Sequence, residues 1–434
     1  MELEDRLKRL TGYNLTRGGD ESVPEEKDRI LELLDGATTD NRFGEFVLVR
    51  KRFALHGLGP TAGAAQSFGV RGEFLSRICS SRKSATNRAS RTPCRLEEAA
   101  FIDCETTGLA GGTGTYAFLV GVGYLSGDDF WVEQYFMQDF HQERAILSAV
   151  AERLNGFKSL VSFNGRCFDV PLLQNRFVIN RLDFDSANWD HLDLLFPSRR
   201  MWKRRIGECS LANLEHQVLG VQREIDVSSY LIPQIYFDYL RTGEADSLVP
   251  VFHHNAQDIF SLLRLSLLID QTLEDHTLTD IRCAEDLFSL SRIHYDLGDY
   301  QSSERCLRQT LSEELPPEWR QLIHVSLGSV YKKMGLMEKA QEAWHEIVDG
   351  GFPFSISACE ELAKYYEHRR REYHRALFFV EKAMSHMNAD RQHIDNAMSR
   401  HGSARHAGIE RWEYRKSRLE RKIEKLQAMP KPAE

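Results

Sequence analysis

Two acidic residues stand two positions apart at the end of a strongly apolar segment. The segment runs from Ala99 to Cys104 and includes Asp103, and Glu105 follows it directly. In an extended strand, residues i and i+2 point to the same face, so the two carboxylates project side by side. Neighbouring carboxylates that lose hydration repel each other, and a hard divalent cation would offset that cost. The pair predicts metal ligands, although surface strands also carry such pairs by chance.

A third acid, Asp169, follows a second short apolar segment. Residues 159–163 are typical of a buried strand, Asn164-Gly165 of a turn, and the residues from Phe168 onward of a helix. Asp169 would then stand near the start of a helix that leaves the sheet, where it can join the first two acids. The alternative is that Asp169 only complements the helix dipole.

A fourth acid, Asp258, comes shortly after two consecutive histidines. His254 stands four residues before Asp258 and would share its helical face, whereas His253 would not unless the helix starts later. A histidine beside a metal-bound water can act as a general base. We expect one of the two histidines to be catalytic and the other structural, and the sequence leaves the choice open.

Together these three elements resemble the DEDD exonuclease superfamily of the ribonuclease H-like fold. The match covers roughly residues 98–270 and rests on motif order: Asp-x-Glu on the first strand, Asn-x-x-x-Phe-Asp at a later turn, and His before the final Asp. The resemblance implies that four acids hold two divalent cations, Mg²⁺ or Mn²⁺: Asp103, Glu105, Asp169 and Asp258. It also implies that a further set of residues binds the substrate: Thr106, Thr107, Gly108, Leu109, Asn164 and Phe168.

The chain departs from both standard subtypes of that superfamily at the catalytic base. The tyrosine subtype has its Tyr where His254 stands. The histidine subtype has its His where His253 stands, usually with Ala two residues later, where this chain has Asn255. The resemblance therefore assigns the acids better than it assigns the base.

The chemistry that the resemblance implies is phosphodiester hydrolysis, in which one metal activates a water and the other stabilises the departing 3′ oxygen. We expect a 3′→5′ exonuclease acting on single-stranded nucleic acid or 3′ ends, and the sequence does not distinguish DNA from RNA. The alternative is a catalytically silent nucleic-acid-binding adaptor, but a retired site usually loses at least one acid. A metal phosphohydrolase of small molecules is less favoured, because the chain lacks an adjacent His-Asp pair with supporting histidines.

A basic segment outside these motifs is the predicted substrate-contacting surface. Residues 199–205 hold five cations and a tryptophan. Cations neutralise phosphates and an indole can stack on a base, so we expect Trp202 and Arg204 to contact nucleic acid. The alternative is a solvated charged face. Asp193, shortly before this segment, is interpreted as a supporting acid and not as a further metal ligand.

The elements that must position these residues follow an α/β order. Strands are predicted at 99–104, 117–125, 130–136 and 159–163, and helices at 143–154, 168–177, 211–219, 233–240 and 249–269. This order predicts a mixed central sheet flanked by helices. We assign the ribonuclease H-like domain to residues 97–272. Residues 1–96 form an N-terminal segment with two short amphipathic helices, a strand at Phe46–Val49 and a basic linker at 82–95.

From about residue 282 the sequence becomes wholly helical and shows an internal period. Segments at 296–300, 333–337 and 370–373 recur at offsets of 37 and 36 residues, and Ala340 and Ala376 follow the second and third. The period is close to the tetratricopeptide unit of about 34 residues. We therefore predict tetratricopeptide-like repeats over residues 280–398, suited to a protein partner, with an ordinary helical bundle as the alternative.

The charged tail, residues 399–434, predicts a helix that docks on the repeats, or less favourably a nucleic-acid-binding arm. The whole arrangement resembles the bacterial YprB-like proteins, which combine a ribonuclease H-like domain with tetratricopeptide repeats. The residues behind this second resemblance are Asp193, the basic segment 199–205, Cys209-Ser210-Leu211 and Glu215.

Composition and charge limit the remaining classes of protein to which the chain can belong. The net charge of −8 argues mildly against a nucleic-acid partner, but a substrate held through metals needs only a local basic surface. The apolar run 116–125 is too short to span a membrane, and the charged start lacks the apolar stretch of a signal peptide. Eight scattered cysteines without a CxxC pair indicate reduced thiols, so we expect a cytoplasmic protein.

Overall fold

The computed structural model describes residues 23–55, 71–72, 94–108, 114–184, 189–223, 226–275, 278, 281, 283–349, 356–394 and 402–428. The chain divides into two compact units. The first comprises Met1–Arg199 and Glu208–Glu274, and the second comprises Arg200–Gly207 and Asp275–Glu434. Among the described helices, none is both long and apolar enough to cross a membrane.

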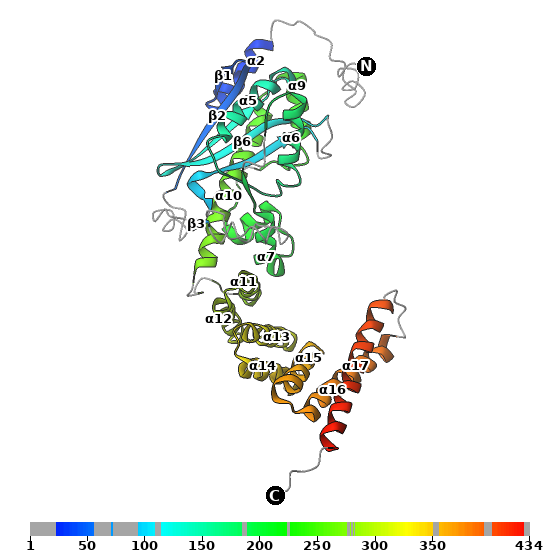
Figure 1. The fold of residues 1–434 in the computed structure, drawn as a ribbon. Helices are drawn as coiled ribbons and strands as arrows, with labels where there is room; N and C mark the ends of the chain where they lie inside the picture. Colours follow the sequence, from blue (N-terminus) through cyan, green and yellow to red (C-terminus); the bar gives the residue numbers. More distant parts are fainter. Residues whose placement is uncertain are drawn as a thin grey trace. The chain divides into compact units, whose positions relative to one another are not determined.

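The first unit is built on a seven-stranded mixed sheet (Figure 1), in the order β1-β2-β7-β6-β5-β8-β9. Along this order, β1, β2, β7, β6 and β5 pair antiparallel with their neighbours. Strand β8 then pairs parallel with β5, and β9 pairs parallel with β8. Their bounds are β1 Ala37–Asn41, β2 Gly44–Ala54, β5 Ala99–Thr106, β6 Ala117–Ser126, β7 Asp129–Phe136, β8 Ser159–Ser162 and β9 Asp190–Asp193. The predicted mixed sheet is confirmed.

Helices cover both faces of this sheet, which explains why its central strands are continuous apolar runs. The two faces are seen at consecutive residues of β7. Glu133 accepts a hydrogen bond from Arg153 of α5 (Glu143–Leu154). Gln134, on the opposite face, donates to Asn255 of α10 (Val249–Glu274). Two further helices, α6 (Asp169–Ile179) and α9 (Ile232–Thr242), complete the layers around the site described below.

The sheet begins earlier in the chain than the predicted domain start at residue 97. Strand β2 pairs with β7 from Val47↔Phe136 to Ala54↔Asp129, and β1 and the helix α2 (Val23–Leu34) come before it. The strand expected at 46–49 is therefore an integral strand of the sheet. Its partner lies some eighty residues away in sequence, and local patterns carry no information on such pairing. The helix expected around Leu3–Leu10 and residues 82–93 of the basic linker lie outside the described residues.

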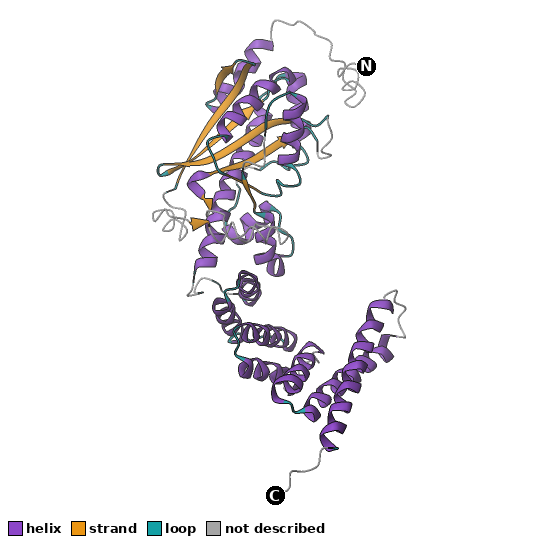
Figure 2. Ribbon diagram, in the orientation of Figure 1, coloured by secondary structure: helices purple, strands orange, loops and turns teal. Residues whose placement is uncertain are grey.

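The described part of the second unit consists of helices that pack in sequential order (Figure 2). Their bounds are α11 Ala284–Leu297, α12 Tyr300–Leu311, α13 Pro317–Lys333, α14 Met337–Asp349, α15 Ile356–Tyr365, the π-helical turn η8 Tyr366–Arg370, α16 Tyr373–Ile394 and α17 Gly402–Gln427.

The internal sequence period corresponds to equivalent turns between paired helices. Gly298, Gly335 and Arg371 each end the first helix of a pair with a positive φ, of 85°, 79° and 57°. Ala340 and Ala376, five residues after the second and third turns, are fully buried. The small residues thus lie where the next helix crosses its neighbours, as the period predicts.

Candidate active site

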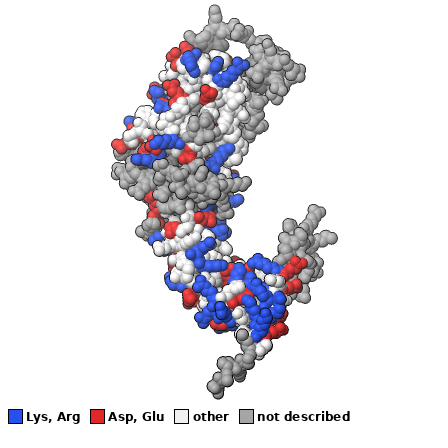
Figure 3. Space-filling model, viewed as in Figure 1, with Lys and Arg blue, Asp and Glu red and all other residues white. Residues whose placement is uncertain are grey.

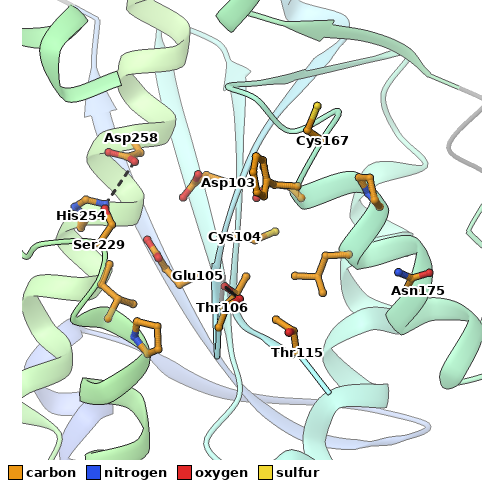
Figure 4. Close-up of a pocket in the computed structure, with 17 residues that line it drawn as sticks. Asp103, Cys104, Glu105, Thr106, Thr115, Cys167, Asn175, Ser229, His254 and Asp258 are labelled. Carbon is orange, nitrogen blue, oxygen red and sulfur yellow. Dashed lines mark hydrogen bonds and ion pairs between the residues drawn. The ribbon is translucent and has the colours of Figure 1, made fainter. Parts of the chain in front are cut away.

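All four predicted acids face one cavity in the first unit, with a volume of about 440 Å³. Asp103 and Glu105 come from β5, Asp169 is the first residue of α6, and Asp258 comes from α10. Figure 4 shows Asp103 and Glu105 directed toward the α10 residues His254 and Asp258. Residues separated by more than 150 positions therefore meet at one spot.

The first two acids are positioned by the pleat of β5. Asp103 pairs with Gly121 of β6 and Glu105 with Leu119, so both carboxylates leave the same face of the sheet. Gly121 is required there for close packing of α10. A Cβ at Gly121 would lie 2.2 Å from Ile259 Cδ1 and 2.4 Å from Asn255 Oδ1. The absence of a side chain at Gly121 thus lets α10, with Asp258, lie near the strand.

Asp169 is positioned by the turn between β8 and α6. Asn164 has a φ of 63°, and a Cβ at Gly165 would lie 2.4 Å from Ser162 Oγ. The buried carboxylate of Asp193 accepts hydrogen bonds from the backbone N–H groups of Asn164 (2.7 Å) and Arg166 (3.1 Å). Asp193 therefore holds the turn that carries Asp169.

The structure separates the two histidines. His254 lines the cavity one helical turn before Asp258, whereas the Nδ1 atom of His253 lies 3.0 Å from Lys51 Nζ on β2. Nδ1 of His254 lies 2.7 Å from Asp226 Oδ1, and its Nε2 lies 3.6 Å from Asp258 Oδ2. Of the two histidines, His254 is therefore the one that lines the cavity with the acids.

Asn255 orients Asp103. Its Nδ2 atom donates to Asp103 Oδ2 at 2.8 Å, and its Oδ1 atom accepts from Gln134 Nε2 at 2.9 Å. The residue is fully buried, so both ends of the amide are used. Asn255 stands where the histidine subtype usually has Ala, and this departure is the sequence signal that marks its position.

An arginine that sequence reasoning missed is bound to the fourth acid. Arg223 donates to Asp258, and it also makes a two-point contact with the buried Glu215 at 2.7 and 2.8 Å. Its Nη1 atom lies 3.2 Å from Asp226 Oδ1 and 3.0 Å from His254 Nδ1. Arg223 follows the helical turn η6 (Glu215–Leu219) in a segment without periodicity, so no pattern linked it to the acids.

Burial and mutual repulsion make the ionised acids costly. Burial raises the pKa of Asp103 well above its ordinary value, and Asp258, Glu105 and Asp169 raise it further. Burial raises the pKa of Glu105 to about 8 and that of Asp169 to about 6. Burial lowers the pKa of His254, but Asp258 and Glu105 outweigh it, so its pKa lies above the ordinary value. The cluster therefore attracts positive charge.

The donor chemistry fits a hard divalent cation. Four carboxylates converge, and oxygen ligands of this kind are those that Mg²⁺ and Mn²⁺ prefer. Among the described residues, no three His, Cys, Asp or Glu side chains are already arranged as a ready-made metal site. Asn255 donates to Asp103 and Arg223 donates to Asp258, so two of the four acids are also bonded to protein donors.

The predicted substrate-binding residues divide into two groups. Thr106, Gly108 and Phe168 line the cavity, and Phe168 is 56% exposed. Thr107 instead accepts a hydrogen bond from the backbone N–H of Tyr116, and Asn164 forms the turn before α6. Leu109 lies outside the described residues. Cavity-lining residues that the sequence did not point to are Cys104, Thr115, Cys167, Pro171, Leu172, Asn175, Ser229, Ile232 and Pro233.

The predicted substrate contact of Trp202 is wrong. Residues 195–206 form the helix α7 (Leu195–Ile206), and Trp202 is only 4% exposed. The Arg204 guanidinium lies over the rings of Phe288 and Trp319, and Arg205 pairs with Asp286 at 2.8 Å. Residues 200–207 belong to the second unit, and the cations Arg200, Arg204 and Arg205 contact other residues of that unit. These contacts are packing contacts within the protein and not a nucleic-acid surface.

Comparison with known proteins agrees with this geometry. Residues 100–269 match the family model of the RNase_H superfamily. The first unit contains a ribonuclease H-like domain. Over 290 residues, the chain is 29% identical to the uncharacterized protein YprB of Bacillus subtilis (strain 168). The matched residues are 66% of this chain and 68% of that protein. The superfamily suggests nuclease activity and nucleic-acid binding, and the finer function has to be argued from the site.

Proposed function

We propose that this protein is a metal-dependent 3′→5′ exonuclease that hydrolyses the phosphodiester bonds of nucleic acid with two divalent cations. The observation that carries the proposal is the convergence of four carboxylates from β5, α6 and α10 on one cavity that also contains His254. The resemblance to the DEDD exonucleases, made on the same residues, supports the direction of cleavage.

Asp103, Glu105, Asp169 and Asp258 would hold the cations. Bound there, the cations would supply an activated water and stabilisation of the departing oxygen. The protein's own groups position the reaction. Asn255 fixes the rotamer of Asp103, and the turn held by Asp193 fixes Asp169.

His254 is the group available to accept a proton from the attacking water. Its Nδ1 atom is held by Asp226, so Nε2 is the atom that faces the acids. Tyrosine-subtype members of the superfamily have their catalytic side chain at this position, which supports His254 over His253. His253 bonds to Lys51 and does not line the cavity.

The cavity is suited to one nucleotide at the end of a strand. Its volume of about 440 Å³ lies within the range of small-molecule pockets, roughly 300–1,000 Å³. Thr106 and Gly108 contribute to one wall, and the exposed ring of Phe168 can stack on a base. A terminal nucleotide fits this description better than an internal base pair of a duplex.

The test uses oligonucleotides labelled at one end. Wild-type protein and the Asp103→Ala variant are incubated with 5′-labelled and 3′-labelled single-stranded DNA and RNA, with Mn²⁺ or with EDTA. A ladder from the 5′-labelled strand and immediate release of mononucleotide from the 3′-labelled strand would support the proposal. Internal cuts at early times would instead indicate an endonuclease.

A second candidate is a nucleic-acid-binding adaptor without catalysis. The observation that favours it is the ion pair of Arg223 with Asp258, which engages the fourth acid. If wild-type protein binds the labelled strands but cleaves none with Mg²⁺ or Mn²⁺, the adaptor is the better account.

A further inference from the structure

The last helix of the second unit, α17, has one face packed against the protein and one exposed face. Trp412, Leu419 and Ile423 are buried, and α17 packs on α16. The buried Glu367 of η8 fixes the helix, since it accepts from Arg418 at 2.6 Å and from Lys422 at 2.8 Å. The exposed face of α17 is therefore held in a defined orientation within the second unit.

Four cations and a tyrosine form a continuous line on this helix. They recur at alternating spacings of three and four residues, which keeps them on one face. We call them the α17 stripe: Arg411, Tyr414, Arg418, Arg421 and Lys425. Arg411 pairs with Glu360 and Arg418 with Glu367, whereas Arg421 and Lys425 are the exposed cations of the stripe on which the proposal depends. At about 1.5 Å per residue, the stripe is about 21 Å long, which corresponds to several nucleotides of a strand at roughly 3.4 Å each.

Of the four acids of the same helix, Glu410 lies beside the stripe and the other three lie on a different flank. Glu413, Glu420 and Glu424 are about a quarter turn or more away from the stripe at 100° per residue. The stretch 356–428 carries sixteen Lys and Arg against eleven Asp and Glu, whereas the whole chain has a net charge of −8. Figure 3 shows Lys and Arg side chains gathered over the C-terminal helices. Positive charge is thus concentrated locally on an otherwise acidic protein.

An exposed aromatic residue lies within this line of cations. Tyr414 is 63% exposed, and the Arg418 guanidinium lies 5.9 Å from the centre of its ring. An exposed tyrosine ring is suited to stacking on an unpaired base. Cations in line with an aromatic platform are the combination that binds single-stranded nucleic acid.

We propose that the α17 stripe binds the sugar-phosphate backbone of a single strand, with Tyr414 stacking on a base. The nature of the partner rests on the proposed nuclease function, and the stripe adds a binding surface outside the ribonuclease H-like domain. This surface replaces the predicted contact at Trp202, which is buried.

The test measures binding without catalysis. Binding of fluorescent single-stranded DNA and RNA oligonucleotides to the full chain is followed by anisotropy in EDTA, at several salt concentrations. The double variant Arg421→Ser/Lys425→Ser removes two exposed cations of the stripe. The matched control is Lys333→Ser/Lys339→Ser, which removes two exposed cations from α13 and α14 of the same unit. Circular dichroism confirms that each variant is folded.

We expect the stripe variant to bind at least tenfold more weakly and the control to bind like wild type. The slope of log affinity against log salt should fall by roughly 1.4, since each phosphate contact on a single strand contributes about 0.7. Tyr414→Ala should weaken binding without changing this slope. Unchanged affinity in the stripe variant, or an equal loss in the control, would overturn the proposal. Failure of wild type to cleave with Mn²⁺ would refute the nuclease function and leave this binding measurement intact.

Discussion

Replacing Glu105 by glutamine should stabilise the metal-free protein while removing a metal ligand. Glu105 is 9% exposed, and burial raises its pKa to about 8 from an ordinary value of 4.5. Groups from several elements face it: Asp103 on the same strand, Asp169 of α6, and His254 and Asp258 of α10. Burial, Asp258 and Asp169 raise its pKa, and they prevail over His254 and Arg223, which lower it.

The pH dependence of the folding stability follows from the raised pKa of Glu105. A carboxyl with a raised pKa binds its proton more tightly in the folded state, so the folded protein loses stability as pH rises from 4.5 toward 8. Each pH unit costs about 1.4 kcal/mol, which gives about 4 kcal/mol at pH 7.5. Glutamine has no charge to bury. In EDTA, Glu105→Gln should therefore be more stable than wild type by up to about 4 kcal/mol at pH 7.5, and the gain should shrink as the pH falls to 5.5.

The assay is urea denaturation followed by circular dichroism between pH 5.5 and 8, with EDTA or with Mn²⁺. Glu133→Gln is the matched control, because Glu133 is also buried but its contacts with Arg153 and Tyr135 overcome the effect of burial and lower its pKa. That variant should be less stable than wild type. Mn²⁺ should stabilise wild type by mass action and should stabilise Glu105→Gln less. A Glu105→Gln variant that is no more stable than wild type at pH 7.5, or whose gain does not change with pH, would refute the reasoning.

Four further substitutions test the site. His254→Ala should lower the cleavage rate in steady-state assays by roughly 10²–10⁴-fold. His253→Ala should change this rate only a few-fold, because His253 lies against Lys51. Equal losses in the two variants would contradict the assignment of His254. Arg223→Gln should lower the free energy of unfolding in EDTA by about 3–5 kcal/mol, since Glu215 and Asp258 lose a buried partner; an unchanged denaturation midpoint would argue against this role. Gly121→Ala should displace Asn255 and weaken Mn²⁺ binding at least tenfold in calorimetric titration, and wild-type affinity would show that α10 tolerates the methyl group.

The strands and acids of the ribonuclease H-like domain could be predicted because their patterns are local. The apolar run before Asp103 predicts a strand, and alternation then fixes the face shared with Glu105. The order of the motifs and the known family geometry predicted that Asp169 and Asp258 would join them. The helix spacing of His254 and Asp258 was also correct.

The features of the fold and of the site that the sequence did not predict depend on contacts between distant residues. The pairing of β2 with β7 and the contact of Arg223 with Asp258 join segments that no local period connects. Trp202 was misassigned for a related reason. A basic amphipathic helix that packs on other helices has the same composition as one that binds phosphates, and only the ring contacts of Arg204 and the burial of Trp202 distinguish the two.

The most direct test of the central claim compares cleavage by wild type and by Glu105→Gln, a variant whose fold the stability measurements verify independently. Both proteins are incubated with end-labelled single-stranded DNA and RNA in Mn²⁺, and wild type also in EDTA. The account predicts cleavage by wild type in Mn²⁺, none in EDTA, and a loss of at least 10³-fold in Glu105→Gln, a reduction of about 4 kcal/mol in transition-state stabilisation. Cleavage that persists in EDTA, or a Glu105→Gln variant as active as wild type, would contradict the assignment of these acids as a metal-dependent catalytic site.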